Sequence, residues 1–183
     1  MKTASVLAAL AMLAVALVPQ AGARKGVAER KDRATGIQLA RLLDGINYHR
    51  KETWKWQRVM QQPLTRYSAS AEKVRSVAYR RWVMHLWIQR ALNARERALN
   101  PPHKAQWLCI HRYEGAWTDP NAPYYGGLQM DDEFQVTYGR RLVRRKGTAD
   151  HWTPLEQMWV AERAFKTRGF WPWPNTARSC GLI

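Results

Sequence analysis

The chain has 183 residues, a formal net charge of +16 at neutral pH and ten tryptophans. The length leaves room for one globular domain and a small additional element, and the hydrophobic fraction of 46% allows a packed core. The excess positive charge indicates an anionic partner, which could be nucleic acid, a membrane surface or an acidic cell-wall polymer.

The first 23 residues have the pattern of a secretory signal peptide. Lys2 precedes an almost wholly apolar run over residues 3–18, and Ala21-Gly22-Ala23 supplies the small residues that signal peptidase reads. We expect cleavage after Ala23 and a secreted, extracellular protein. The alternative is an uncleaved membrane anchor, although the apolar run is shorter than the roughly 20 residues that span a bilayer.

Positive charge is concentrated before residue 107. Residues 24–106 contain 19 Lys and Arg against 6 Asp and Glu, whereas residues 107–183 contain 10 against 8. The sequence Asn100-Pro101-Pro102 is a strong break signal between the two regions. We therefore expect three parts: a signal peptide at 1–23, a basic module at 24–100 and a near-neutral, aromatic-rich domain at 101–183.

Apolar spacing predicts helices over residues 37–48, 53–60 and 69–99, forming a basic helical hairpin. Two interpretations of this module remain. Its basic face is either simply solvated or anchors the protein electrostatically to the wall or the membrane surface. The apolar stripe expected along the third helix consists of Val74, Val77, Ala78, Arg81, Met84, Trp87 or Ile88, and Leu92. The arginines expected to lie largely off this stripe are Arg75, Arg80, Arg90, Arg95 and Arg97.

The sequence predicts a short helix over residues 103–114. It ends at Glu114, because Gly115 suits the position after a helix. The negative end of the helix dipole disfavours a carboxylate there, and nearby aromatic rings would desolvate it. Both effects favour the protonated carboxyl that a glycosidase needs as its proton donor. The alternative is an ordinary surface residue at a fraying helix end.

A loop or short β-hairpin follows, with the sequence Tyr124-Tyr125-Gly126-Gly127-Leu128-Gln129. Its adjacent glycines permit close backbone approach to a ligand, and the Gln129 amide can bond sugar hydroxyls and N-acetyl groups. Asp131 and Asp132 suit the start of a helix. Thr153-Pro154-Leu155-Glu156 predicts a further helix with a capping box, which ends at Gly169.

These segments resemble the resuscitation-promoting factor and transglycosylase-like domain family, which has a small lysozyme-like fold. The resemblance covers about residues 107–181. One departure is that four residues separate Cys109 from Glu114, whereas the cysteine directly precedes the glutamate in typical members. The matching segments are Trp107-Leu108-Cys109, Glu114-Gly115, YYGGLQ at 124–129, Leu155-Glu156-Gln157, Val160–Arg163, Gly169, Pro172-Trp173-Pro174 and Cys180-Gly181.

The resemblance implies a mainly α fold with Glu114 as the catalytic acid and a disulfide between Cys109 and Cys180. That pairing is also expected because these are the only cysteines of an exported chain. The resemblance makes Gln129 and its YYGG lead-in the substrate-cleft segment and Gln157 a cleft-facing glutamine. The residues expected to bind substrate are Trp117, Tyr124, Tyr125, Gly127, Gln129 and Gln157.

The expected activity is cleavage of peptidoglycan glycan strands, by a lytic transglycosylase or a muramidase, in a monomer with no metal and no cofactor. Four acidic residues are weaker candidates for a second carboxylate: Asp119, Asp131, Asp132 and Glu133. The first alternative is a non-catalytic wall-binding or signalling module of lysozyme-like shape. The second is a nucleic-acid binder, against which the signal peptide and the cysteine pair argue.

Overall fold

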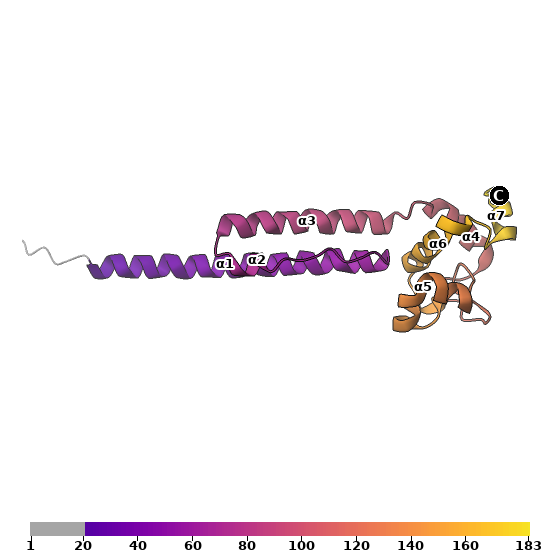
Figure 1. Ribbon diagram of the computed structural model, residues 1–183, viewed down its shortest axis with the longest axis horizontal. Helices are drawn as coiled ribbons and strands as arrows, with labels where there is room; N and C mark the ends of the chain where they lie inside the picture. The colour runs from indigo at the N-terminus through magenta and orange to yellow at the C-terminus, as the bar shows by residue number, and fades with distance from the viewer. Residues whose placement is uncertain (1–20) are drawn as a thin grey trace, which may run out of the picture. The chain divides into compact units, whose positions relative to one another are not determined.

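The computed structural model describes residues 21–183 (Figure 1). The predicted signal peptide lies outside these residues except for Ala21-Gly22-Ala23. The described chain divides into two units, of which the first ends at Gln38 and the second covers Leu39–Ile183, and the packing described below concerns the second. Helices make up 71% of the structure and strands 2%, which confirms the prediction of a mainly α fold with a short hairpin. Among the described helices, none has the length and apolar character needed to cross a membrane.

The elements follow one another in a simple order. They are α1 (Ala21–Val59), α2 (Ser70–Lys73), α3 (Val77–Leu99), α4 (Lys104–Glu114), β1 (Tyr124–Tyr125), β2 (Met130–Asp131), α5 (Asp132–Lys146), the 3-10 helix η1 (Ala149–His151), α6 (Pro154–Arg168) and α7 (Pro174–Ser179). The two helices predicted over 37–48 and 53–60 are therefore parts of one helix. The helix predicted over 69–99 is divided, because Val74 is extended and Ser76 caps a new helix by accepting a hydrogen bond from the Tyr79 amide.

From Leu39 onward, α1 runs parallel to α3, so the two long helices of the predicted basic module do not reverse direction at a simple turn. The start of α3 lies beside Leu39, and its end packs with Met60 in a cluster that includes Ala94 and Ala98. Between the helices, the chain returns along α1 as an extended segment. The indole of Trp54 donates to the Thr65 carbonyl at 2.8 Å, which fixes part of this return (Figure 1).

Arg80 holds the far end of the returning segment. Its guanidinium donates to the carbonyls of Leu39 (2.7 Å), Glu72 (3.0 Å) and Val74 (3.2 Å), and the residue is only 6% exposed. Hydrogen bonding to three backbone acceptors offsets the cost of burying this charge. The prediction that Arg80 lies off the packed face is therefore wrong.

The packed face of α3 differs from the predicted stripe in other positions too. Val74 and Leu92 are exposed, and the buried residues are Arg80, Val83, Trp87, Ala91, Ala94 and Ala98. Alanines at 91, 94 and 98 let the helix approach its neighbours closely. The predicted stripe omitted these alanines because it was chosen mainly from large apolar residues.

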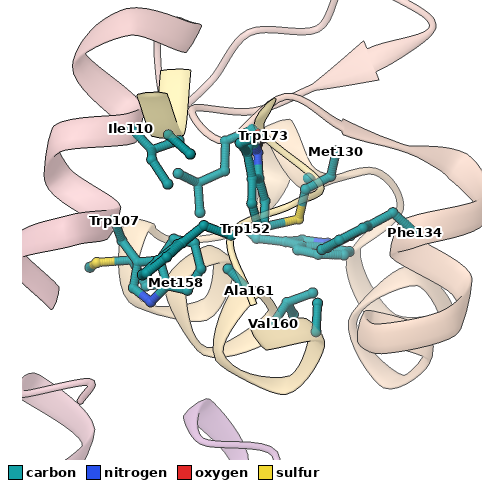
Figure 2. Close-up of a cluster of buried hydrophobic side chains, with 14 of the residues drawn as sticks. Trp107, Ile110, Met130, Phe134, Trp152, Met158, Val160, Ala161 and Trp173 are labelled. Atoms are coloured by element: carbon teal, nitrogen blue, oxygen red, sulfur yellow. Dashed lines mark hydrogen bonds between the residues drawn. The ribbon is translucent and has the colours of Figure 1, made fainter. Parts of the chain in front are cut away.

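Helix α6 is the centre of the C-terminal core (Figure 2). The α6 residue Met158 packs there, and the larger buried side chains around the helix are Trp107, Ile110, Leu128, Met130, Phe134, Leu142, Trp152 and Trp173. The α6 residue Glu162 accepts hydrogen bonds from the His103 amide at 2.7 Å and the Trp107 indole at 2.9 Å. These bonds fix the N-terminus of α4, where the helix dipole favours a carboxylate.

Local capping signals were predicted correctly. Asp131 caps α5 by accepting from the Phe134 amide, and Thr153 and Glu156 form the capping box of α6. Helix α4 ends at Glu114 as expected, with Gly115 as the capping residue. Trp107 and Ile110 form the buried face of α4, whereas Tyr113 is 55% exposed.

Replacing Arg80 with Met would leave three backbone carbonyls without their donor. We expect Arg80→Met to lower the free energy of unfolding by about 3 kcal/mol, since each buried acceptor left unpaired costs about 1–3 kcal/mol and water can satisfy some of them. Urea denaturation followed by circular dichroism measures this loss. The exposed neighbour Arg81 supplies the control, Arg81→Met. Equal unfolding midpoints for the two variants would contradict the role of Arg80.

Candidate functional site

Glu114 lies at the edge of a pocket formed where the end of α4 meets the hairpin and the start of α7. The pocket has a volume of about 280 Å³. Its lining residues are Glu114, Tyr124, Gln129, Pro172, Trp173, Pro174 and Asn175. A carboxyl group in a hollow with two aromatic residues and two amides is a suitable arrangement for binding and protonating a sugar.

The carboxyl of Glu114 is held by one hydroxyl. Thr176 Oγ1 of α7 donates to Glu114 Oε1 at 2.8 Å. Within residues 21–183, Glu114 makes no ion pair and no other side-chain hydrogen bond. One oxygen is therefore oriented while the other has no protein partner in the described chain.

The predicted disulfide between Cys109 and Cys180 is confirmed, with Cα atoms 6.1 Å apart. It joins α4 to the residue that follows α7. Thr176 lies one helical turn before Cys180, whose amide donates to the Thr176 carbonyl. The disulfide thus holds the Thr176 hydroxyl close to the end of α4, where Glu114 lies.

The predicted hairpin forms, with Tyr124 opposite Asp131 and Tyr125 opposite Met130. At its tip, Gln129 has a left-handed backbone with φ of +46°. Its side-chain nitrogen donates to Asp119 Oδ2 and to the Gly126 carbonyl, both at 2.9 Å. The Gln129 amide oxygen makes no hydrogen bond within residues 21–183, so an acceptor is left at the pocket wall.

The paired glycines approach protein groups closely, which differs from the expected approach to a ligand. A Cβ at Gly126 would lie 2.6 Å from the Gln157 amide oxygen, and Gly126 has a φ of +72°. A Cβ at Gly127 would lie 2.6 Å from His111 Nδ1 and 2.7 Å from the Trp117 ring. Both positions therefore require glycine in order to pack the loop onto α4 and α6.

Gln157 lies beneath this loop and is fully buried. Its amide oxygen accepts from the Gly127 amide at 2.9 Å. Its nitrogen donates to the carbonyls of Trp117 (2.7 Å), Ala149 (2.8 Å) and Trp152 (3.2 Å). One side chain thus joins the cleft loop to the η1 segment, and it does not line the Glu114 pocket.

Of the predicted substrate-binding residues, the structure brings Tyr124 and Gln129 into the pocket with Glu114. The other four lie in or under the loop. Trp117 stacks on His111 with ring centroids 3.9 Å apart, Tyr125 packs on the C-terminal core, and Gly127 and Gln157 bond to each other.

Thr176 was not singled out from the sequence, and Trp173 was given no role in the pocket. The indole of Trp173 donates to the Leu128 carbonyl at 2.6 Å, and the side chain also lines the pocket. The expected disulfide contained a usable signal. Thr176 precedes Cys180 by one helical turn and Glu114 follows Cys109 in the same helix, so the disulfide brings the two regions together.

The candidates for a second carboxylate have other contacts. Asp119 Oδ1 accepts from the backbone and side-chain nitrogens of Asn121, while its Oδ2 accepts from Gln129. Asp131 caps α5, and neither Asp132 nor Glu133 lines the Glu114 pocket. Across residues 21–183, no three His, Cys, Asp or Glu side chains gather as a metal site would require.

Comparison of the chain with protein-family models, curated proteins and solved structures finds no match. The resemblance described from the motifs therefore stays a prediction.

Replacing Gln157 with Leu would leave the Gly127 amide and three carbonyls without their partner. We expect Gln157→Leu to lower the free energy of unfolding by about 2–4 kcal/mol, given about 1–3 kcal/mol for each buried group left unpaired. It should also speed hydrogen exchange at the Gly127 amide. Chemical denaturation and exchange mass spectrometry measure the two effects. Gln106→Leu on α4 is the control, and indistinguishable exchange in the two variants would rule out the bracing role.

Proposed function

We propose that this protein cleaves the glycan strands of bacterial peptidoglycan between N-acetylmuramic acid and N-acetylglucosamine, with Glu114 as the catalytic acid. The observation that carries the proposal is the position of the Glu114 carboxyl in the pocket. It lies with Tyr124 and Trp173, has one hydroxyl donor, and has no cationic partner among the described residues.

Glu114 protonates the bridging oxygen as the glycosidic bond breaks, and the sugar develops oxocarbenium-like charge. The resulting carboxylate then acts as a base. It removes a proton either from the muramic 6-hydroxyl, which gives an anhydro product, or from water, which gives a hydrolysed one. Thr176 keeps one carboxyl oxygen oriented, so the other is available for proton transfer.

A single protein carboxyl is sufficient in this mechanism. Both oxygens of Asp119 accept hydrogen bonds within the loop, one from Asn121 and the other from Gln129, so this carboxylate has a structural role. The acetamido group or the 6-hydroxyl of the substrate stabilises or captures the cationic centre in place of a second carboxylate. No metal or cofactor is needed for these steps.

Three residues around Glu114 fit the substrate. The amide oxygen of Gln129 accepts a hydrogen bond from a sugar hydroxyl or an acetamido N–H. Tyr124, which is 50% exposed, offers a ring and a hydroxyl at the rim. Trp173 supplies an apolar wall, fixed by its bond to the Leu128 carbonyl.

The setting proposed for this activity is extracytoplasmic. The signal pattern at residues 1–23 and the Cys109–Cys180 disulfide support export, because disulfides persist in oxidising compartments. The basic residues 24–100 support association with an anionic wall polymer or membrane surface. The protein acts as a monomer on peptidoglycan, and nucleic acid is not its substrate.

The Glu114→Gln variant removes the transferable proton and keeps the shape of the side chain. We expect the rate of muropeptide release from purified peptidoglycan to fall by roughly 100-fold or more, since general acid catalysis contributes about 10²–10⁴. Glu133→Gln is the control, because Glu133 is exposed on α5 and outside the pocket. Unchanged release by Glu114→Gln would reject the catalytic assignment. Binding of peptidoglycan by the wild type without any product would favour the non-catalytic wall-binding module.

The role of Thr176 as a positioning residue predicts a distinct kinetic signature. We expect Thr176→Val to lower kcat about tenfold with KM within about twofold, because the lost bond orients the acid and does not bind sugar. Thr176→Ser keeps the hydroxyl and should restore most of kcat. A rise in KM at unchanged kcat would contradict this role.

A further inference from the structure

A second pocket, of about 380 Å³, shares no lining residue with the Glu114 pocket. It lies between the segment where α1 ends and the C-terminal half of α5, both within the unit of residues 39–183. Four arginines line it, together with one amide and two leucines. They are Arg58, Arg141, Arg144, Arg145, Gln61, Leu64 and Leu142.

The four guanidinium groups carry uncompensated positive charge. None of them makes an ion pair or a side-chain hydrogen bond within residues 21–183. The neighbouring Lys146 differs, since it pairs with Glu156 at 2.6 Å. Cations near helix C-termini complement the helix dipole, which accounts in part for Arg144 and Arg145. Arg141, one turn earlier, is not explained in this way.

Gln61 supplies an independent sign of a ligand. Its side-chain nitrogen is buried without a hydrogen-bond partner in the described chain. The opposite end of the amide is fixed, because Gln61 Oε1 accepts from Arg163 Nη1 at 2.7 Å. Exchanging the oxygen and nitrogen of this amide would place two donors, the amide nitrogen and the Arg163 guanidinium, against each other. Gln61 lines the pocket, and its nitrogen lacks an acceptor, a cost that a small rotation of the amide toward an acceptor bound in the pocket would remove.

The backbone at Gln61 supports a specific role for this residue. Its φ of +54° lies in the left-handed region, where a non-glycine side chain is disfavoured. The chain leaves α1 at this point, and glycine would adopt the conformation without strain. A glutamine here keeps an amide at the wall of the arginine-lined pocket.

We propose that this pocket binds a polyol- or sugar-phosphate ester, such as the repeating group of an anionic wall polymer. One guanidinium group can bind two phosphate oxygens at once, and several guanidinium groups can bind the same phosphate. A single carboxylate has too few oxygens for four arginines and the Gln61 amide. The volume exceeds that of a bare phosphate, and Leu64 and Leu142 offer an apolar floor to the carbon chain. A free ester can enter this hollow and contact the arginines and the leucines together, which a flat lipid surface or a nucleic-acid duplex cannot do.

This inference does not depend on glycan cleavage at Glu114. Calorimetric titration of the full chain with sn-glycerol 3-phosphate at physiological salt tests it, with glycerate, a polyol that carries a single carboxylate, as the comparison. We expect saturable binding of glycerol 3-phosphate that is at least about tenfold tighter than that of glycerate. No saturation by about 10 mM, or equal binding of glycerate, would overturn the proposal.

Variants separate the pocket from general surface charge. The double variant Arg141→Gln/Arg145→Gln should weaken binding by at least about tenfold, since each bond to a charged group contributes substantially. Gln61→Glu keeps the acceptor for Arg163 but replaces the free donor with a negative oxygen, and should weaken binding similarly. Arg140→Gln removes a charge from the same helix outside the pocket, and should change the affinity less than about twofold.

Three results would overturn the proposal. One is an equal loss per removed charge in the Arg141/Arg145 and Arg140 variants, and another is an unchanged affinity in Gln61→Glu. The third is tight binding of phosphatidylglycerol vesicles, with similar losses in all variants and no binding of free glycerol 3-phosphate. That pattern would assign the arginines to a membrane surface.

Discussion

The site depends on the buried amide of Gln157. This side chain is fully buried and bonds the Gly127 amide and three carbonyls from two separate loops. Both ends of an amide are polar, so the group is stable in the core only while these loops keep their positions. The YYGGLQ hairpin, with Tyr124 and Gln129 at the pocket, is therefore positioned from beneath by α6.

The same helix positions α4, because Glu162 fixes the start of this helix, which ends at Glu114. It also contacts the basic module, since the Trp159 indole donates to the Ala98 carbonyl at the end of α3. The Cys109–Cys180 disulfide adds a covalent link between α4 and the Thr176 segment. Closing a loop of 71 residues contributes at most roughly 4 kcal/mol in the chain-entropy model. The acid, its orienting hydroxyl and the hairpin are thus held by three kinds of constraint.

Features with a local chemical cause could be predicted from the sequence. The capping box of α6, the Asp131 cap and the end of α4 at Gly115 depend on neighbouring residues only. The parallel course of α1 and α3 and the burial of Arg80 depend on a returning segment whose partners are distant in sequence. For the same reason, the place of Gln157 under the loop, away from the pocket, could not be read from its helix. The proximity of Thr176 to Glu114 could have been predicted, because the expected disulfide links the helical turn of Thr176 to α4.

The central claim is that the Glu114 pocket breaks a glycosidic bond. Mass spectrometry of purified, uncross-linked glycan strands after incubation with the wild-type protein tests it most directly. Cleavage at this pocket gives shorter fragments that end in muramic acid, as anhydro sugars if the 6-hydroxyl is the acceptor or as reducing sugars if water is. Strands of unchanged length, at protein concentrations that bind them, would contradict it.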